Sequence, residues 1–304
     1  MPRLLKPRAL EPGATIAIAA PGGPIDPARL EEGAALWRDA GFRVVQRDDV
    51  AARRGYLAGD DKRRVQELAS WIKDRRVDAI VCARGGYGCD RILDRFDAAA
   101  FRAARKPLIG YSDITALLLW QKRHAGLMGF HGPMLERGKE LDREVFADLL
   151  AQLAGAVAQP LVGRGEGGGR GEGRLVGGSL TMVAASIGTD WEIDTRGAIL
   201  LLEEVGERPY RVDRMLQQLR GAGKLAGLAG VGIGDVSTCH DPKYPSPEAE
   251  EVILEVLRPL RVPLVLGLPF GHTPRNRAWP FGARATIDGR RGEVRVLEAG
   301  VARG

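Results

Sequence analysis

The most constraining feature of this sequence is a regular alternation of short apolar runs with amphipathic segments over its first 120 residues. The apolar runs cover residues 15–20, 79–83 and 107–110. Between them, apolar side chains recur every three or four residues around 27–40, 61–75 and 90–104, a spacing typical of helices. This alternation predicts a parallel sheet with helices on both faces.

The carboxyl ends of parallel strands meet at one edge of a sheet, and ligands of such folds bind there. Three loops follow the predicted strands at this edge, at residues 21–24, 84–88 and 111–113. These loops are therefore the expected place for a functional site.

The second half of the chain has a different pattern. Residues 180–188 predict a helix of small residues, and 198–202 form an apolar strand that ends in Glu203 and Glu204. A further helix is expected around 212–219, and further strands are expected at 231–236, 263–267 and 285–288. This pattern predicts a smaller α/β domain with a mixed sheet.

A glycine-rich stretch, residues 163–173, separates the two halves and contains a GxGxxG pattern. A dinucleotide site would need a strand before these glycines and a helix after them, and neither is indicated, so a linker or hairpin loop is favoured. We expect a flavodoxin-like or Rossmann-like α/β domain over 1–155, a linker over 156–172 and a C-terminal α/β domain over 173–304.

Composition argues against several kinds of partner. The net charge is +6, but basic and acidic residues are interleaved, so no nucleic-acid footprint is indicated. A mild positive field suits a small acidic substrate better. No apolar run approaches the ~20 residues that cross a bilayer, and none follows the charged N-terminus as in a secretory signal. We therefore expect a cytoplasmic protein with no membrane partner.

Metal and cofactor chemistry is not indicated either. The three cysteines include no CxxC pair, and the four histidines form no HExxH or HxH pattern. We therefore expect no metal site, and the serine mechanism considered below needs no organic cofactor.

The most informative segment is Gly110–Thr115, in which a serine joins a buried strand to a helix. Such a strand–turn–helix arrangement holds the hydroxyl of Ser112 at the sheet edge, and the next backbone N–H, that of Asp113, can donate to a developing oxyanion. The pattern is G-x-S-x-I rather than the G-x-S-x-G of many hydrolases. Taken alone, Ser112 is better explained as a helix N-cap.

The neighbouring loop, Ala83–Gly88, is rich in glycine, which lets a backbone approach a ligand closely. Arg84 in this loop could bind a carboxylate through its guanidinium group. A tight turn explains the loop taken alone, but two such loops at one sheet edge favour a site.

A serine nucleophile needs a base. His272, in the loop after strand 263–267, is the accessible candidate, and His131 is its rival. The other two histidines, His124 and His240, are expected at the surface.

An orienting carboxylate is also required. Glu203 ends an apolar strand, where a charge is costly unless it is paired or used. A salt bridge with Arg211 or Arg214 is the structural alternative for this residue.

Taken together, these motifs resemble the LD-carboxypeptidases, serine peptidases of the S66 type. The resemblance runs through nearly the whole chain, and the order and spacing of the motifs make it specific. The matching segments are Ala20–Gly23, Ala83–Gly88, Gly110–Thr115, His131–Met134, Gly173–Gly178, Leu201–Glu207, Tyr210–Arg214 and Pro269–His272.

The resemblance implies a Ser–His–Glu triad that cleaves an L,D-peptide bond in the cytoplasm. Ser112 is then the nucleophile, His272 the general base and Glu203 the orienting acid, and the backbone N–H groups of Gly86 and Asp113 are the oxyanion donors. The family removes the terminal D-alanine from murein tetrapeptides, so the expected substrate is a small muropeptide. Members are commonly dimers, so a homodimer is expected.

Two residue assignments stay open within this resemblance. The acidic member is ambiguous among Glu203, Glu204 and Glu207; Glu203 is chosen because it lies best at the strand end, and its neighbour on the strand faces the other way. Arg84 is the candidate for holding the terminal carboxylate of the substrate.

The alternative functions come from different classes. A related branch hydrolyses a peptide–nucleotide antibiotic conjugate as an immunity enzyme, and Trp191 or Trp279 could then form an aromatic shelf. A non-catalytic small-molecule binding module on the same sheet is the third possibility. The segments Leu201–Glu207 and Tyr210–Arg214 resemble the murein branch more closely.

Overall fold

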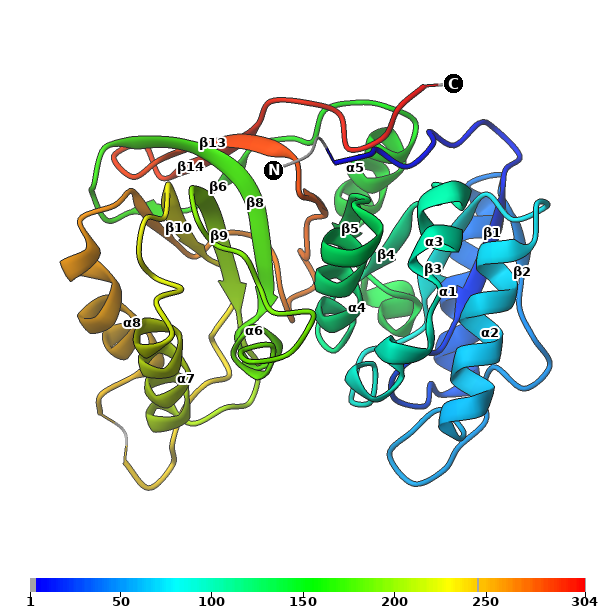
Figure 1. Ribbon diagram of the computed structural model, residues 1–304, viewed down its shortest axis with the longest axis horizontal. Coiled ribbons are helices and arrows are strands. Elements are labelled where there is room, and N and C mark those ends of the chain that lie inside the picture. Colours follow the sequence, from blue (N-terminus) through cyan, green and yellow to red (C-terminus); the bar gives the residue numbers. More distant parts are fainter. Residues whose placement is uncertain (1–3, 245, 304) are drawn as a thin grey trace.

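The computed structural model describes residues 4–244 and 246–303, which form two sheets packed side by side (Figure 1). The first sheet has the strand order β12-β5-β4-β3-β1-β2. Its pairings are parallel except at the edge, where β12 runs antiparallel to β5. Its strands are β1 (Thr15–Ala19), β2 (Arg43–Val45), β3 (Ala79–Cys82), β4 (Leu108–Gly110), β5 (Gly129–His131) and β12 (Trp279–Phe281).

Helices cover both faces of this sheet. In β1, Ile16 shares an apolar cluster with Trp37 of α1, whereas the next residue, Ala17, shares one with Leu68 of α2. Successive strand residues face opposite sides, so α1 and α2 lie on opposite faces and the predicted α/β class is confirmed. The helical segments of this half are α1 (Pro27–Asp39), α2 (Asp61–Lys73), η1 (Asp90–Arg95), α3 (Ala98–Ala104), α4 (Ile114–Trp120), η2 (Gln121–Ala125), η3 (Leu135–Glu140) and α5 (Arg143–Leu153).

The single helix expected over residues 90–104 is instead two segments. The 3₁₀ helix η1 ends before Asp97, and α3 begins after it. The Asp97 carboxylate accepts hydrogen bonds from the backbone N–H groups of Ala99 and Ala100. This N-cap lies inside the segment and starts a second helix, whereas the apolar spacing had predicted one continuous helix.

The second sheet has the strand order β6-β14-β13-β8-β9-β10-β11-β7. Strands β8, β9, β10 and β11 are parallel neighbours and the other pairings are antiparallel, so this sheet is mixed, as predicted. Its strands are β6 (Leu161–Val162), β7 (Arg164–Gly165), β8 (Arg170–Ser179), β9 (Ala198–Glu203), β10 (Gly230–Ile233), β11 (Leu264–Leu266), β13 (Arg284–Asp288) and β14 (Glu293–Val296). The helical segments of this half are α6 (Leu180–Ala185), α7 (Pro209–Gly221), α8 (Ala249–Leu257) and η4 (Arg258–Leu260).

The glycine-rich stretch forms strands of the second sheet rather than a structureless connection. Strand β7 pairs with β11, and the first residues of β8 pair with β13. Strand β12, from the C-terminal half of the chain, returns to the edge of the first sheet.

The domain limits 1–155, 156–172 and 173–304 stay a prediction. Among the residues described, no helix has the length and apolarity that crossing a bilayer requires.

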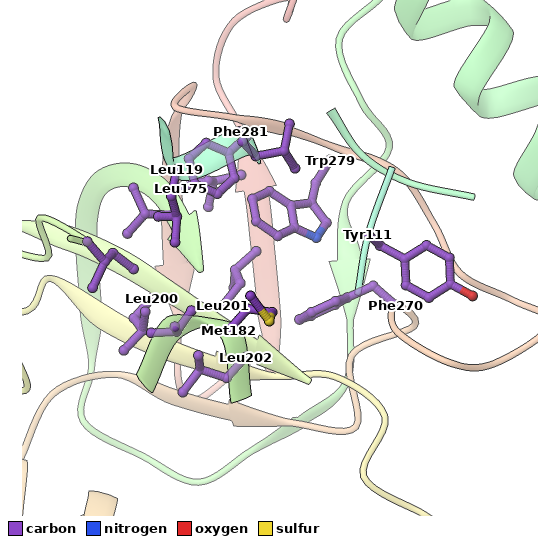
Figure 2. Close-up of a cluster of buried hydrophobic side chains, with 14 of the residues drawn as sticks. Tyr111, Leu119, Leu175, Met182, Leu200, Leu201, Leu202, Phe270, Trp279 and Phe281 are labelled. Atoms are coloured by element: carbon purple, nitrogen blue, oxygen red, sulfur yellow. The ribbon is translucent and has the colours of Figure 1, made fainter. Parts of the chain in front are cut away.

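A common apolar core joins the two sheets. Tyr111 and Leu119 belong to the same buried cluster as Leu201 of β9, and Figure 2 shows these side chains around one packed region. Helix α4 packs against α6 and β8, and the Ser179 N–H donates to Thr115 Oγ1 at 3.2 Å. Because Ser179 pairs with the last residue of β9, this packing brings the ends of β4 and β9 to one place.

A buried ion pair in the first half generates the first prediction. The Glu67 carboxylate has no exposed surface and accepts hydrogen bonds from the Ala20 N–H and from Arg63 Nη2, both at 2.7 Å. Its removal leaves the buried Arg63 guanidinium with a longer, 3.6 Å ion pair from Nε to Asp49 Oδ1. Glu67→Ala should therefore lower the free energy of unfolding by about 3–5 kcal/mol. Equilibrium unfolding in urea measures this loss.

The matched control is Glu31→Ala, which breaks an exposed pair with Arg38 and should change the unfolding free energy little. If the Glu67 variant lost no more stability than the control, the buried pair would not hold α2 to the end of β1.

Candidate active site

Ser112 lies in the turn between β4 and α4. Its φ of +60° is in the left-handed region, which costs a non-glycine residue roughly 1–2 kcal/mol. Strain of this kind is typical of the turns that hold a nucleophile at a sheet edge. The residue in the N-cap position of α4 is Asp113 rather than Ser112, so the N-cap explanation does not account for this serine.

The loop of residues 84–88 packs directly against this turn. A Cβ atom on Gly85 would lie 2.8 Å from Cβ of Ser112, so only glycine fits there. The backbone N–H groups of Gly86 and Asp113 donate to no other described residue. Two free N–H groups beside the serine can therefore donate to an oxyanion.

The Asp113 side chain has a structural role. Its Oδ2 atom accepts a hydrogen bond from the Cys89 N–H at 3.0 Å, which ties the glycine loop to the elbow turn. Burial raises the pKa of this carboxyl.

Arg84 lies at the start of the glycine loop, and its side chain is 44% exposed. Its Nη1 donates to the Pro24 carbonyl oxygen at 3.0 Å, and its Nε lies 3.1 Å from Glu136 Oε2. Two of the three nitrogens of this guanidinium, Nη1 and Nε, therefore already have protein partners.

Glu203 and His272 form the central contact of the site. Glu203 ends β9 with no exposed surface, and its Oε2 lies 2.7 Å from Nδ1 of His272. His272 lies in the loop between β11 and β12 and is 16% exposed. Gly271 has φ +111°, and a Cβ there would lie 2.9 Å from Glu203 Oε2, so this close approach requires glycine.

The other two acidic residues of this segment have different partners. Glu204 accepts hydrogen bonds from the backbone N–H groups of Thr181 at 2.7 Å and Val205 at 2.9 Å, and burial raises its pKa. Glu207 pairs with Arg211 at 3.1 Å. Only Glu203 of the three therefore contacts His272 among the described residues.

The rival histidine, His131, is fully buried. It stacks on Trp279 with ring centroids 4.8 Å apart, and burial lowers its pKa to about 3. A neutral ring without exposed surface cannot exchange protons with a substrate. His124 contacts the Asp190 carbonyl oxygen at 3.1 Å, and His240 is exposed.

Tyr111 connects the two halves of the site. It precedes Ser112, and its ring centroid lies 4.9 Å from that of His272. No hydrogen bond joins the Ser112 hydroxyl to His272 within residues 4–244 and 246–303. In structures without substrate such bonds are often long and tighten only in the complex.

The sequence analysis assigned no role to four polar side chains of this region, those of Tyr111, Glu136, Arg137 and Asn276. Arg137 Nε donates to the Tyr111 hydroxyl at 3.1 Å, and Glu136 lies beside the same hydroxyl. Asn276 Oδ1 accepts the Gly271 N–H at 2.9 Å, which fixes the loop next to His272. The available signals were the position of Tyr111 inside an elbow motif and that of Glu136 just after the His131–Met134 motif.

No cluster of three or more histidine, cysteine, aspartate or glutamate side chains suited to a metal ion occurs among the described residues. The cysteines Cys82, Cys89 and Cys239 are free and buried. Burial raises the pKa of each thiol, so none is readily ionised.

Both halves of the chain match family models. The LD-carboxypeptidase N-terminal domain matches residues 16–132, and the LD-carboxypeptidase C-terminal domain matches residues 172–287. A Bacillus subtilis protein named as a probable murein peptide carboxypeptidase is 35% identical, over 98% of this chain and 96% of its own. The murein tetrapeptide carboxypeptidase of Pseudomonas aeruginosa is 36% identical, over 80% of this chain and 82% of its own.

A solved structure of MccF in complex with glutamyl sulfamoyl guanosine has a similar fold. The TM-score is 0.89 at 22% identity, covering 99% of this chain and 100% of that chain. At this identity the similarity concerns the fold alone. With both domain models matched and relatives aligned over most of their length, the chain belongs to the LD-carboxypeptidase family of serine peptidases.

Proposed function

We propose that this protein releases the terminal D-alanine from murein tetrapeptides by means of a Ser112–His272–Glu203 triad. The observation that carries the proposal is the 2.7 Å contact between Glu203 Oε2 and His272 Nδ1 beside an elbow serine. A histidine held in this way presents its other nitrogen, Nε2, as a general base. The names of the murein-directed relatives support the substrate class.

In the acylation half of the reaction, Ser112 Oγ attacks the carbonyl carbon of the L,D-bond while His272 Nε2 takes the hydroxyl proton. Glu203 keeps the proton of Nδ1 in place and stabilises the imidazolium. The N–H groups of Gly86 and Asp113 donate to the oxyanion. His272 then gives its proton to the nitrogen of D-alanine, which leaves as the free amino acid.

The acyl-enzyme is then hydrolysed. His272 takes a proton from water, the water oxygen attacks the ester carbonyl, and the proton returns to Ser112 Oγ as the ester bond breaks. The shortened peptide leaves with a new carboxylate, and each cycle consumes one water molecule.

We also propose Arg84 as part of the substrate-binding wall. Its half-exposed guanidinium adds positive charge at the loop that carries Gly86. A muropeptide carries several carboxylates, so positive charge at this edge favours its binding.

The murein peptide is better supported than a nucleotide conjugate. Trp191 and Trp279, which could have formed a nucleobase shelf, are 6% and 0% exposed. A buried ring offers no face to a ligand. The buried Glu203–His272 pair likewise favours an enzyme over a non-catalytic binding module, because a binder has no need of an oriented base.

The family resemblance further implies a homodimer that acts in the cytoplasm. We retain both as parts of the proposal. The reaction itself depends on neither.

The decisive assay incubates the protein with a murein tetrapeptide and follows the loss of one alanine by mass spectrometry. We expect Ser112→Ala to lower kcat by several orders of magnitude, about 10³-fold or more, because the nucleophile is lost. Folding should be unaffected, since the substitution removes a single hydroxyl group from a partly exposed turn residue.

The control is Ser70→Ala, which removes a hydroxyl that bonds only to the carbonyl of Glu67 on its own helix. Turnover by Ser112→Ala close to that of this control would refute the serine mechanism. Hydrolysis of a peptide–nucleotide conjugate without release of alanine would move the protein to the immunity branch.

A second prediction compares three glutamine substitutions. Glu203→Gln should lower kcat by about 10²- to 10⁴-fold, because the amide cannot stabilise the imidazolium of His272. Glu204→Gln and Glu207→Gln should stay within a few-fold of the wild type per folded molecule, since their carboxylates contact backbone N–H groups and Arg211 instead.

Thermal melting of the three variants corrects the rates for any unfolded fraction. If Glu204→Gln or Glu207→Gln proved the crippled variant, the orienting acid would be misassigned.

A further inference from the structure

A group of charged side chains beside the triad is not used by the catalytic steps described above. This group, here termed the Glu136 cluster, consists of Arg84, Tyr111, Glu136 and Arg137. Arg84 Nε lies 3.1 Å from Glu136 Oε2, and the Tyr111 hydroxyl lies 3.5 Å from Glu136 Oε1. Arg137 Nε donates to the Tyr111 hydroxyl oxygen at 3.1 Å.

The Glu136 cluster adjoins both the nucleophile and the base. Tyr111 directly precedes Ser112, and its ring centroid lies 4.9 Å from that of His272. Its hydroxyl points away from the apolar core and from Phe270, as Figure 2 shows. Arg84 lies two residues before Gly86, the proposed oxyanion donor. A ligand group bound to this cluster would therefore lie close to a bond attacked by Ser112.

The cluster carries more positive than negative charge. The cluster holds two guanidinium groups, of which that of Arg84 pairs with Glu136 and that of Arg137 bonds to Tyr111, and one carboxyl group, that of Glu136. Burial raises the pKa of this carboxyl, and the two arginines oppose that effect. At least one guanidinium thus remains uncompensated whether Glu136 is ionised or not, and such a group attracts an anion.

The two arginines differ in the donors that they have left. Arg84 uses Nε toward Glu136 and Nη1 toward the Pro24 carbonyl oxygen. Arg137 uses only Nε, toward Tyr111, and its Nη1 and Nη2 have no partner among the residues described. Two adjacent free N–H donors of a guanidinium match the two oxygens of a carboxylate. Arg137 therefore has a pair of free N–H donors, on Nη1 and Nη2, that can bind both oxygens of a carboxylate.

We propose that Arg137 binds the terminal carboxylate of the peptide substrate, with Tyr111 fixing the orientation of its guanidinium and Glu136 holding Arg84 alongside. This inference rests on the proposed function, in which one amino acid separates the scissile bond from a free carboxylate. A carboxylate held at a fixed distance from Ser112 admits a single residue on the leaving side. Arg137 thereby makes the enzyme an exopeptidase.

The test compares a murein tetrapeptide with the same peptide amidated at its C-terminus, which removes only the carboxylate charge. The wild type should show a kcat/KM about 10- to 100-fold higher for the acid than for the amide. Arg137→Gln should abolish this preference by lowering kcat/KM for the acid alone. Arg137→Lys should restore part of the preference, because it returns the charge without the pair of N–H donors.

The matched control is Arg143→Gln, which removes the same charge from an exposed arginine at the start of α5. This variant should keep the wild-type preference for the acid. Equal losses on acid and amide in Arg137→Gln, or an unchanged preference, would overturn the proposal.

A binding experiment separates this inference from the proposed function. Calorimetry with Ser112→Ala measures the affinity for acid and amide without any turnover. A preference for the acid that disappears in the Ser112→Ala/Arg137→Gln double variant supports the carboxylate site even if the wild type releases no alanine. Equal affinities for acid and amide in Ser112→Ala overturn it even if alanine is released.

Tyr111→Phe keeps the proposal testable if Arg137→Gln does not fold. It removes only the hydroxyl that orients Arg137 and should reduce the ratio of acid to amide kcat/KM. A ratio unchanged in a folded Tyr111→Phe protein would contradict the proposed geometry.

Discussion

Burying the carboxylate of Glu203 is the constraint on which this active site depends. A carboxylate without exposed surface is strongly destabilising unless a donor or a cation compensates it. The His272 ring supplies that compensation, because its Nδ1 lies 2.7 Å from the carboxylate. The buried carboxylate therefore stabilises the position of His272, and His272 in turn stabilises the buried charge. Gly271 makes the approach possible, because any Cβ at that position would collide with Glu203. The pair is therefore a property of the packed fold and does not need substrate to form.

Glu203 ends a strand of the second sheet, and His272 lies in the loop that leads from this sheet to β12. Ser112 follows a strand of the first sheet, so the proposed chemistry depends on how the sheets are joined. Strand β12 crosses back to pair with β5, and this path carries the His272 loop toward the elbow turn. The Ser179–Thr115 hydrogen bond and the shared apolar core fix the same junction from the side of β8. Substitutions in this core should therefore affect the alignment of His272 with Ser112 as well as stability.

Features that depend on residues adjacent in the chain could be predicted from the sequence. Ser112 could be singled out because strand, turn and helix follow one another directly. Features made by distant segments could not be predicted. The contact of Arg137 with Tyr111 joins residues 26 positions apart, and the strands of the glycine-rich stretch exist only because β11 and β13 lie beside them. The family resemblance and the position at the strand end favoured Glu203 over its two acidic neighbours, and its 2.7 Å contact with His272 agrees with that choice.

In the proposed mechanism, His272 activates the hydroxyl of Ser112. The most direct measurement is reaction of the folded protein with a fluorophosphonate, followed by mass mapping of the modified peptide. We expect a single adduct on Ser112 and a large loss of labelling rate in His272→Ala, since an unactivated serine is a weak nucleophile. An adduct on a different serine, or equal labelling of Ser112 after loss of His272, would contradict this mechanism.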